Sequence, residues 1–273
     1  MRILTCLKII PDLDQVPEAD WASGASSGFF DFRGIKTILD PLSECGVELA
    51  LRFRDAAQDA AVELEALTAL PTGEDPKPAV RMLRTLAALG FLHTTLITDS
   101  PVSPAAPDVT AQVLADYCRT HGPYDLIVIG AQSADGGTGM TGLLLAEQLG
   151  LPCRTNVARF SPSDPTAAIT AEYTRDGFRI QETVDTPVVL TIDDVPGALL
   201  RVPTLRQRKS AANAAPEEIS YTENGADLPE SRYALTGTAL IDQSRSGVLI
   251  EGKDAAAMAA RLYEDYLKGG GYL

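Results

Sequence analysis

The chain has 273 residues, 45% of them hydrophobic and 22% charged, which is typical of a globular protein long enough to bury a sizeable core. A net charge of −14 argues against a nucleic-acid or anionic-membrane surface, because such surfaces need segregated basic patches. The sequence lacks an apolar run near the roughly 18 residues of a membrane span and an N-terminal secretory cleavage region. We therefore expect one large or two small domains in the cytoplasm.

Cysteine and histidine residues form no recognisable metal or catalytic pattern. The four cysteines are scattered, without a C-x-x-C pair, which predicts neither a zinc site nor a disulfide framework. We interpret them as small core residues in a reducing compartment. The two histidines, His93 and His121, are grouped with no nucleophile or ligand set. The sequence therefore predicts no catalytic side chain and no metal.

The N-terminal part predicts a strand, a long excursion and a helix. Residues 2 to 9, RILTCLKI, form a first strand that ends before Pro11. From residue 12 to 36 the composition turns to Gly, Ser, Pro and Asp, which predicts a long loop with a short hairpin near residues 28 to 34. Asp40 is then placed as an N-cap, and Pro41 occupies the first position of an amphipathic helix.

The next elements alternate between strand and helix. Residues 62 to 66, VELEA, alternate apolar and acidic side chains, which predicts a strand with one solvated or lightly covered face. A helix follows from Val80 to its end at Gly90, then a strand over residues 94 to 98 and a helix over residues 109 to 117. This alternation predicts right-handed crossovers and a parallel sheet with helices on both faces.

The central stretch, residues 125 to 150, reads DLIVIGAQSADGGTGMTGLLLAEQLG and predicts a buried strand, a glycine loop and a helix that ends at Gly150. Glycines let backbone N–H groups approach an anion, and a helix N-terminus favours negative charge, so phosphate is the expected guest. Residues 137 to 142 match G-x-G-x-x-G, but the following strand ends without the acid of the dinucleotide fingerprint. A tight turn without a ligand is the alternative.

After Gly150 the pattern changes. Four segments predict an antiparallel extension that includes a hairpin: residues 153 to 160, 169 to 174, 178 to 183 and 188 to 192. Residues 196 to 229 lack periodicity and predict an extended arm, and Asp254 caps a last helix. We expect an α/β nucleotide-binding domain over residues 1 to 195, and a C-terminal arm and helix over residues 196 to 273 that bind a partner.

Taken in order, these segments resemble the beta subunit of electron transfer flavoproteins. The opening ILTCLKIIPD is similar to the family's ILVCVKQVPD pattern, and the central loop is similar to its DLVLCGRQAIDGDTGQVGPMLAELLGLP stretch. The helix ILDPLSECGVELALRFRD and the arm LLRVPTLRQRKSA also resemble family segments. The resemblance implies a Rossmann-like fold of the adenine-nucleotide-binding type. It also implies AMP above the strand ends, or in electron-bifurcating members the adenylate half of a second FAD.

Carried over to this chain, the resemblance implies particular sites and partners. The loop would hold the phosphates, and the strand ends would surround the nucleoside. The implied cofactor-binding residues are Cys6, Asp40, Ala69, Asp135, Gly136, Gly137, Thr138, Gly139 and Thr141. The main FAD would be shared with an alpha subunit in a heterodimer. Leu205 is the implied anchor for a flavin dehydrogenase.

Two departures from the family pattern affect the expected ligand. The Arg or Lys that precedes Gln in the family is Ala131 here, and the Asn that precedes Pro is Asp40. A lost cation and an added carboxylate both disfavour a doubly charged AMP phosphate. These departures argue against full occupancy by AMP.

The function implied by the resemblance is that of an electron-carrier subunit between dehydrogenases and an acceptor, in which the flavin supplies the redox chemistry. The alternative is a stand-alone adenine-nucleotide-binding α/β protein without a redox role, either a sensor or an adenylate-processing enzyme. The enzyme is the weaker interpretation, because the loop offers Asp135 and no nearby Lys, Arg or His.

Overall fold

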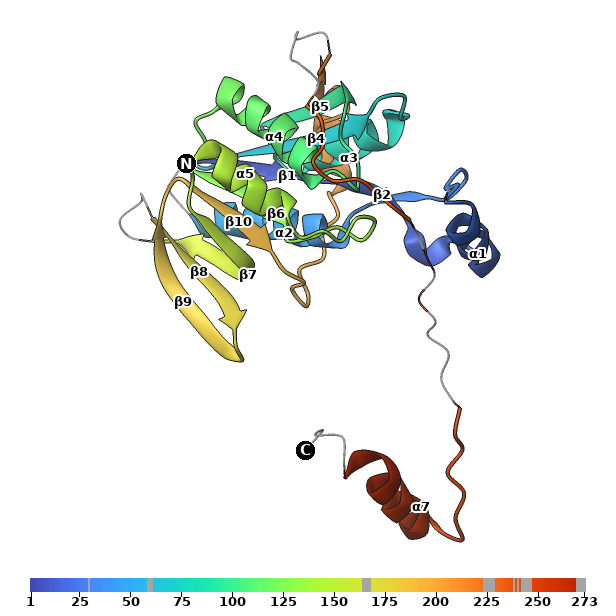
Figure 1. Ribbon diagram of the computed structural model, residues 1–273. Helices are drawn as coiled ribbons and strands as arrows, with labels where there is room; N and C mark the ends of the chain where they lie inside the picture. Colours follow the sequence, from blue (N-terminus) through green and yellow to red (C-terminus); the bar gives the residue numbers. More distant parts are fainter. Residues whose placement is uncertain are drawn as a thin grey trace. The chain divides into compact units, whose positions relative to one another are not determined.

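The computed structural model describes residues 1–28, 30–57, 61–163, 168–222, 229–237, 239, 241 and 247–268. The chain divides into two compact units, Met1–Thr238 and Ala239–Leu273. The first unit contains the sheets and the helices from α1 to α6, and the second contains α7 (Figure 1).

The first unit is built on a nine-stranded sheet in the order β11-β5-β4-β1-β6-β10-β7-β8-β9. Its strands are β1 (Arg2–Cys6), β4 (Glu63–Pro71), β5 (His93–Ser100), β6 (Leu126–Gly130), β7 (Cys153–Pro162), β8 (Ala168–Arg175), β9 (Phe178–Asp185), β10 (Val188–Ile192) and β11 (Glu217–Ser220). Neighbours from β11 to β7 pair in parallel, and β8 pairs antiparallel with β7 and β9. The predicted α/β fold class is confirmed.

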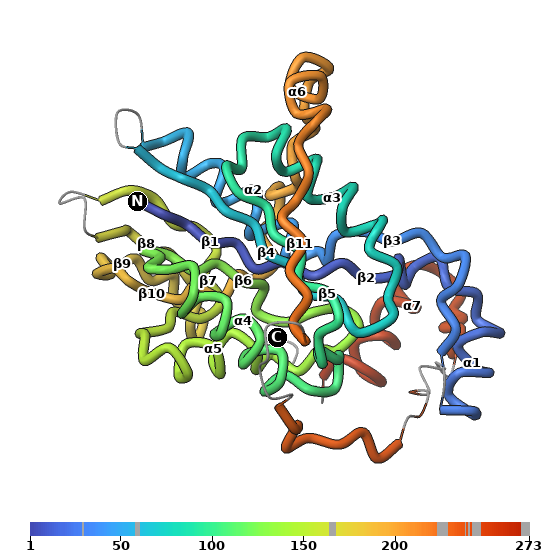
Figure 2. The backbone as a smooth tube through the Cα atoms, turned by 90° about the horizontal axis from the view of Figure 1, so that it is seen from above, coloured from blue at the N-terminus to red at the C-terminus, as the bar shows by residue number. Residues whose placement is uncertain are grey.

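Helices cover both faces of the sheet. α2 (Pro41–Ala56) and α3 (Lys77–Ala88) lie on one face, and α4 (Pro107–His121) and α5 (Thr141–Leu149) lie on the other (Figure 2). Successive strand residues point to opposite faces, so the sheet separates two cores. On β1, Ile3 belongs to the core with Phe53 of α2, whereas Leu4 belongs to the core with Leu114 of α4 and Leu145 of α5.

The strand order creates a crevice at the centre of the sheet. β1 lies between β4 and β6, and the chain builds outward to β5 before it crosses back to β6. The connections that leave the carboxyl ends of β1 and β6 therefore turn to opposite faces. Open α/β sheets bind ligands at such a switch point.

The segment predicted as a long loop contains regular structure. β2 (Ile9–Pro11) pairs antiparallel with β3 (Thr37–Leu39), so the first strand stops at Cys6 and a second begins at Ile9. Between them lie a 3-10 turn (Leu13–Gln15) and α1 (Glu18–Ser27), whose Ala-, Ser- and Gly-rich sequence has no apolar stripe to reveal a helix. Residues 32 to 35 form a turn, so the hairpin predicted near there is wrong. Phe29 lies outside the described residues.

The lightly covered face predicted for β4 is wrong at Glu65. This side chain is 3% exposed, and its carboxylate accepts hydrogen bonds from Arg2 Nη2 at 2.6 Å and from Tyr124 Oη at 3.0 Å. β4 lies inside the sheet, between β1 and β5, and is covered on both faces. The buried carboxylate is tolerated because a guanidinium pairs with it.

Two later segments also lie elsewhere than predicted. β10 belongs to the parallel part of the sheet, between β6 and β7, instead of the antiparallel extension. The arm forms α6 (Leu205–Ser210) and then returns to add β11 beside β5 at the sheet edge. The four residues EEIS of β11 are too few and too polar to show a strand pattern.

The second unit contains α7 (Ala255–Leu262) followed by a π-helical turn (Tyr263–Leu267). Asp254 caps the helix, as predicted, because its Oδ1 accepts the N–H of Ala257 at 2.8 Å.

Candidate functional site

The glycine loop joins the carboxyl end of β6 to the start of α5. Gly137 and Gly139 have φ of 61° and 64°, a left-handed conformation that residues with a Cβ rarely adopt. Gly142 lies in the first turn of α5, where a Cβ would be 2.6 Å from Thr191 Cγ2 of β10. Two glycines of the G-x-G-x-x-G match therefore shape the turn, and the third lets α5 pack closely on the sheet.

Backbone N–H groups at the end of this loop are available to a ligand. Ala134 N–H donates to Asp40 Oδ2 at 2.8 Å, and Gly137 N–H donates to Ser133 O at 2.8 Å. The N–H groups of residues 138 to 141 have no acceptor within the part of the chain that the structure describes. These successive donors lead into α5, whose N-terminal dipole favours an anion.

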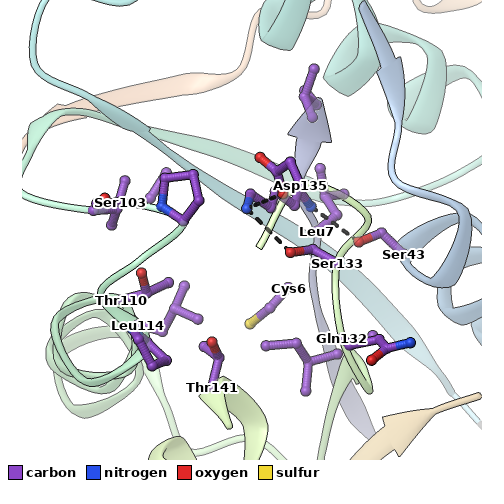
Figure 3. Close-up of a pocket in the computed structure, with 18 of the residues that line it drawn as sticks. Cys6, Leu7, Ser43, Ser103, Thr110, Leu114, Gln132, Ser133, Asp135 and Thr141 are labelled. Atoms are coloured by element: carbon purple, nitrogen blue, oxygen red, sulfur yellow. Dashed lines mark hydrogen bonds and ion pairs between the residues drawn. The ribbon is translucent and has the colours of Figure 1, made fainter. Parts of the chain in front are cut away.

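Lys8 brings a cation to the loop. Its Nζ lies 2.5 Å from Asp135 Oδ1 and 3.3 Å from Ser133 Oγ. Figure 3 labels both acceptor residues among those that line the pocket. The prediction that the loop has no nearby Lys, Arg or His is therefore wrong. The break between β1 and β2 places Lys8 at the carboxyl edge of the sheet, and its position directly after a buried strand is the signal that identifies it. The side chain is 35% exposed, so a ligand can reach it.

Asp40 connects the start of α2 to the glycine loop. It is 1% exposed, and its Oδ1 accepts the N–H groups of Leu42 at 3.1 Å and Ser43 at 3.4 Å, while Oδ2 accepts that of Ala134. Burial raises the pKa of this carboxyl above its ordinary value of 3.8, although the three N–H donors oppose the shift. Asp40 therefore acts on the site by positioning backbone.

A cavity of about 320 Å³ lies at this edge of the sheet. Its lining includes several residues implied by the resemblance: Cys6, Ala69, Asp135, Gly139 and Thr141. Asp40, Gly136, Gly137 and Thr138 are near it in sequence or structure but do not line it. The lining also contains residues that sequence reasoning missed: Lys8, Phe32, Ser43, Glu74 and Ser133.

Cys6 lies at the end of β1 and lines the cavity (Figure 3). It is 3% exposed, and burial raises the pKa of its thiol well above 9.0. The thiol is therefore neutral at physiological pH and contributes volume to the cavity instead of a nucleophile.

Leu205 does not line the cavity. It begins α6 and is 71% exposed. The arm that precedes it is tied to α2, because Arg201 pairs with Glu48 at 3.0 Å and with Asp55 at 2.5 Å. Leu205 therefore presents an apolar side chain to solvent on a tethered helical turn.

The chemistry of the cavity suits an anion attached to an apolar group. Free N–H groups and Lys8 serve the anion, and much of the remaining lining is apolar, including Val102, Pro107 and Leu114. The described residues hold no group of His, Cys, Asp and Glu side chains arranged to bind a metal ion. Among the same residues, no helix has the length and apolar character needed to cross a membrane.

Comparison with known proteins agrees with the sequence pattern. A family model described as electron transfer flavoprotein domain matches residues 28–223. The putative electron transfer flavoprotein subunit YgcR of Escherichia coli is 32% identical over 270 residues, which are 98% of each chain. The beta subunit of the electron transfer flavoprotein of Clostridium acetobutylicum is 27% identical over 87% of this chain and 85% of its own.

A third relative is named as a subunit of a larger complex. CarD of the caffeyl-CoA reductase-Etf complex of Acetobacterium woodii is 29% identical over 70% of this chain and 68% of its own. Together with the fold and the family match, these relatives confirm the resemblance in the sequence: the chain belongs to the beta-subunit family of electron transfer flavoproteins.

Proposed function

We propose that this electron-transfer subunit binds an adenine nucleotide, AMP or the adenylate half of FAD, in the cavity at the carboxyl edge of the sheet. The observation that carries the proposal is that free backbone N–H groups and the ammonium group of Lys8 border the same cavity. Gly139, Met140 and Thr141 line the same cavity as Lys8. Successive amides at a helix N-terminus together with an ammonium group fit a phosphate.

The pairing of Lys8 with Asp135 leaves room for a phosphate. An ammonium group has three donors, and Asp135 Oδ1 and Ser133 Oγ are its two acceptors in this part of the structure. A third donor is left for a phosphate oxygen. Asp135 holds the lysine over the loop but also adds negative charge, which favours a singly charged phosphate diester over a dianion.

The second part of the proposal concerns partners. The chain pairs with an FAD-bearing alpha subunit, and the heterodimer carries electrons from flavin dehydrogenases to an acceptor. The flavin, when bound, supplies the electron transfer. This chain binds and positions the nucleotide and excludes water from it. Leu205 is the proposed anchor for a dehydrogenase, supported by its 71% exposure on the tethered arm. CarD, a relative that is named as a subunit of a reductase-Etf complex, also supports a partner.

The nucleotide is tested by what the protein releases and by the loss of Lys8. Mass spectrometry after denaturation is expected to find AMP or FAD, whereas ATP alone would favour a sensor. Lys8→Met keeps a side chain of similar length and removes its charge. The affinity for AMP, measured by calorimetry, is therefore expected to fall about 10- to 100-fold. Lys77→Met, on an exposed lysine of α3 outside the cavity, is the control. Equal affinities in the two variants would contradict the proposed phosphate site.

A further inference from the structure

Residues 13–28 and 30–36 form a segment, here called the flap, whose two ends are held together. β2 pairs with β3 through Ile9–Leu39, Ile10–Ile38 and Pro11–Thr37, and Asp12 N–H donates to Lys36 O at 2.8 Å. Within the flap, hydrogen bonds connect near neighbours, such as Gly28 N–H to Gly24 O at 2.9 Å. Among the described residues, the backbone hydrogen bonds that connect the flap to the rest of the unit lie at these two ends.

An aromatic cluster gives the flap a small core of its own. Trp21 of α1 meets the ring of Phe30 edge-on at 5.4 Å and that of Phe32 at 6.1 Å, and the two phenylalanine rings are stacked at 6.2 Å with planes 7° apart. Phe30 lies directly on Gly24, where a Cβ would be 2.1 Å from its ring. Three rings in such offset and edge-on contacts hold one another in place.

Phe32 is the member of this cluster that lines the cavity. It is the one aromatic side chain among the described lining residues. The ring is partly exposed although Trp21 and Phe30 pack against it. One member of the cluster therefore keeps an apolar surface available to a ligand in the cavity.

The charge of the flap favours contact with the uncharged base of a nucleotide over contact with its phosphate. Between residues 13 and 36 the chain carries the acids Asp14, Glu18, Asp20 and Asp31 against the bases Arg33 and Lys36. Arg33 is bound to Asp31 at 2.6 Å. An acidic flap repels a phosphate, whereas Lys8 and the loop amides attract it. The phosphate is therefore directed to the loop, and the uncharged base is left for the flap.

We propose that Phe32 is a base-binding residue of this cavity, which holds a planar nucleobase by ring contact and is kept in place by Trp21 and Phe30. The inference rests on the proposed function and adds to it the residue that selects a planar base. In proteins that bind single-stranded nucleic acid, alanine substitution of an aromatic residue that stacks on one base weakens binding about 5- to 100-fold.

The test compares two ligands on the full-length chain freed of nucleotide: AMP, and ribose 5-phosphate, which lacks the base. Phe32→Ala is expected to weaken AMP binding about 5- to 100-fold in calorimetry and to leave ribose 5-phosphate binding unchanged. Phe32→Tyr keeps the ring and restores AMP affinity. Trp21 is the single tryptophan of the chain, so its fluorescence reports directly on the flap, and AMP but not ribose 5-phosphate is expected to change it.

Phe178→Ala is the matched control, because Phe178 is 72% exposed on β9 and does not line the cavity. Circular dichroism checks that each variant is folded. If the wild type binds AMP and Phe32→Ala binds it equally well, the inference about Phe32 is overturned while the nucleotide site stands. If the wild type binds neither ligand, the proposed nucleotide function itself fails and Phe32 loses its role with it.

Discussion

Asp40 shows how one residue can be structural and electrostatically costly at the same time. Its three backbone donors satisfy a carboxylate that is 1% exposed. Burial nevertheless raises the pKa of Asp40 above 3.8. Between 3.8 and the raised pKa, the folded state binds a proton more readily than the unfolded chain, so the stability contributed by Asp40 decreases as pH rises through this window.

Replacement of this carboxylate makes the sign measurable. Asp40→Asn removes the titration and keeps a good helix N-cap. The free energy of unfolding of the wild type, minus that of the variant, is expected to decrease as pH rises from about 4 to 7. Urea denaturation at constant ionic strength measures this difference. A difference that increases with pH would mean that the hydrogen bonds from Leu42, Ser43 and Ala134 outweigh burial.

Lys8 supplies the positive charge beside the glycine loop. The loop itself has no cation, and the charge comes from a residue more than a hundred positions earlier in the chain. Its ammonium group pairs with the carboxylate of Asp135, whose side chain is 15% exposed. Because the pair is partly shielded from solvent, salt screens its attraction less than that of a surface ion pair. The electrostatics of the loop therefore depend on β1 as much as on the loop sequence.

At the scale of elements, the start of α5 is set by its distance from the sheet. A Cβ at Gly142 would lie 2.6 Å from Thr191 Cγ2 and 3.0 Å from Ile129 Cγ2. Both neighbours are β-branched residues of central strands, which cannot move away as the end of a flexible side chain can. The free amides before α5 are therefore placed by the packing of Gly142.

Gly142→Ala is expected to lower the free energy of unfolding by about 1–3 kcal/mol, because overpacking must push α5 away from β6 and β10. The same displacement is expected to weaken AMP binding. Urea denaturation and calorimetry measure the two effects. Gly237→Ala is the control, since a Cβ there would meet nothing within 4 Å. Identical stabilities of the two variants would show that the contact between α5 and the sheet can accept a methyl group at residue 142.

At the scale of the whole molecule, the two compact units divide at Thr238, and the second offers an apolar helix surface. Met258, Leu262 and Tyr266 follow one another at i, i+4 spacing and are 37%, 43% and 48% exposed. We propose that this surface docks on the alpha subunit. The first unit has its own two cores and does not need the helix for its sheet.

A chain truncated after residue 238 tests this division of roles. It is expected to melt within a few degrees of the full-length chain, because its cores are intact. Co-expressed with a matching alpha subunit, the full-length chain is expected to elute as a yellow heterodimer in size-exclusion chromatography, and the truncated chain as a monomer. A truncated chain that pairs as well as the full-length one would place the docking surface within the first unit.

The sequence alone determined the strand, glycine loop and helix around residues 125 to 150, the parallel α/β class and the family resemblance. These follow from local chemistry, since apolar runs, glycine positions and helix caps act within a few residues of one another. In the long excursion only the two ends could be predicted, because α1 has no apolar stripe and the contacts of Trp21 with Phe30 and Phe32 follow no helix or strand period.

The tertiary structure decided what the strand order brings together. It buried Glu65 against Arg2, placed β10 inside the parallel sheet and returned β11 to the edge. It also set Lys8 beside Asp135 and carried Phe32 to the cavity. The physical reason is common to all of them: a side chain's environment in a sheet is set by neighbouring strands, and central neighbours in this sheet, such as β1 and β6 or β6 and β10, lie far apart in the chain.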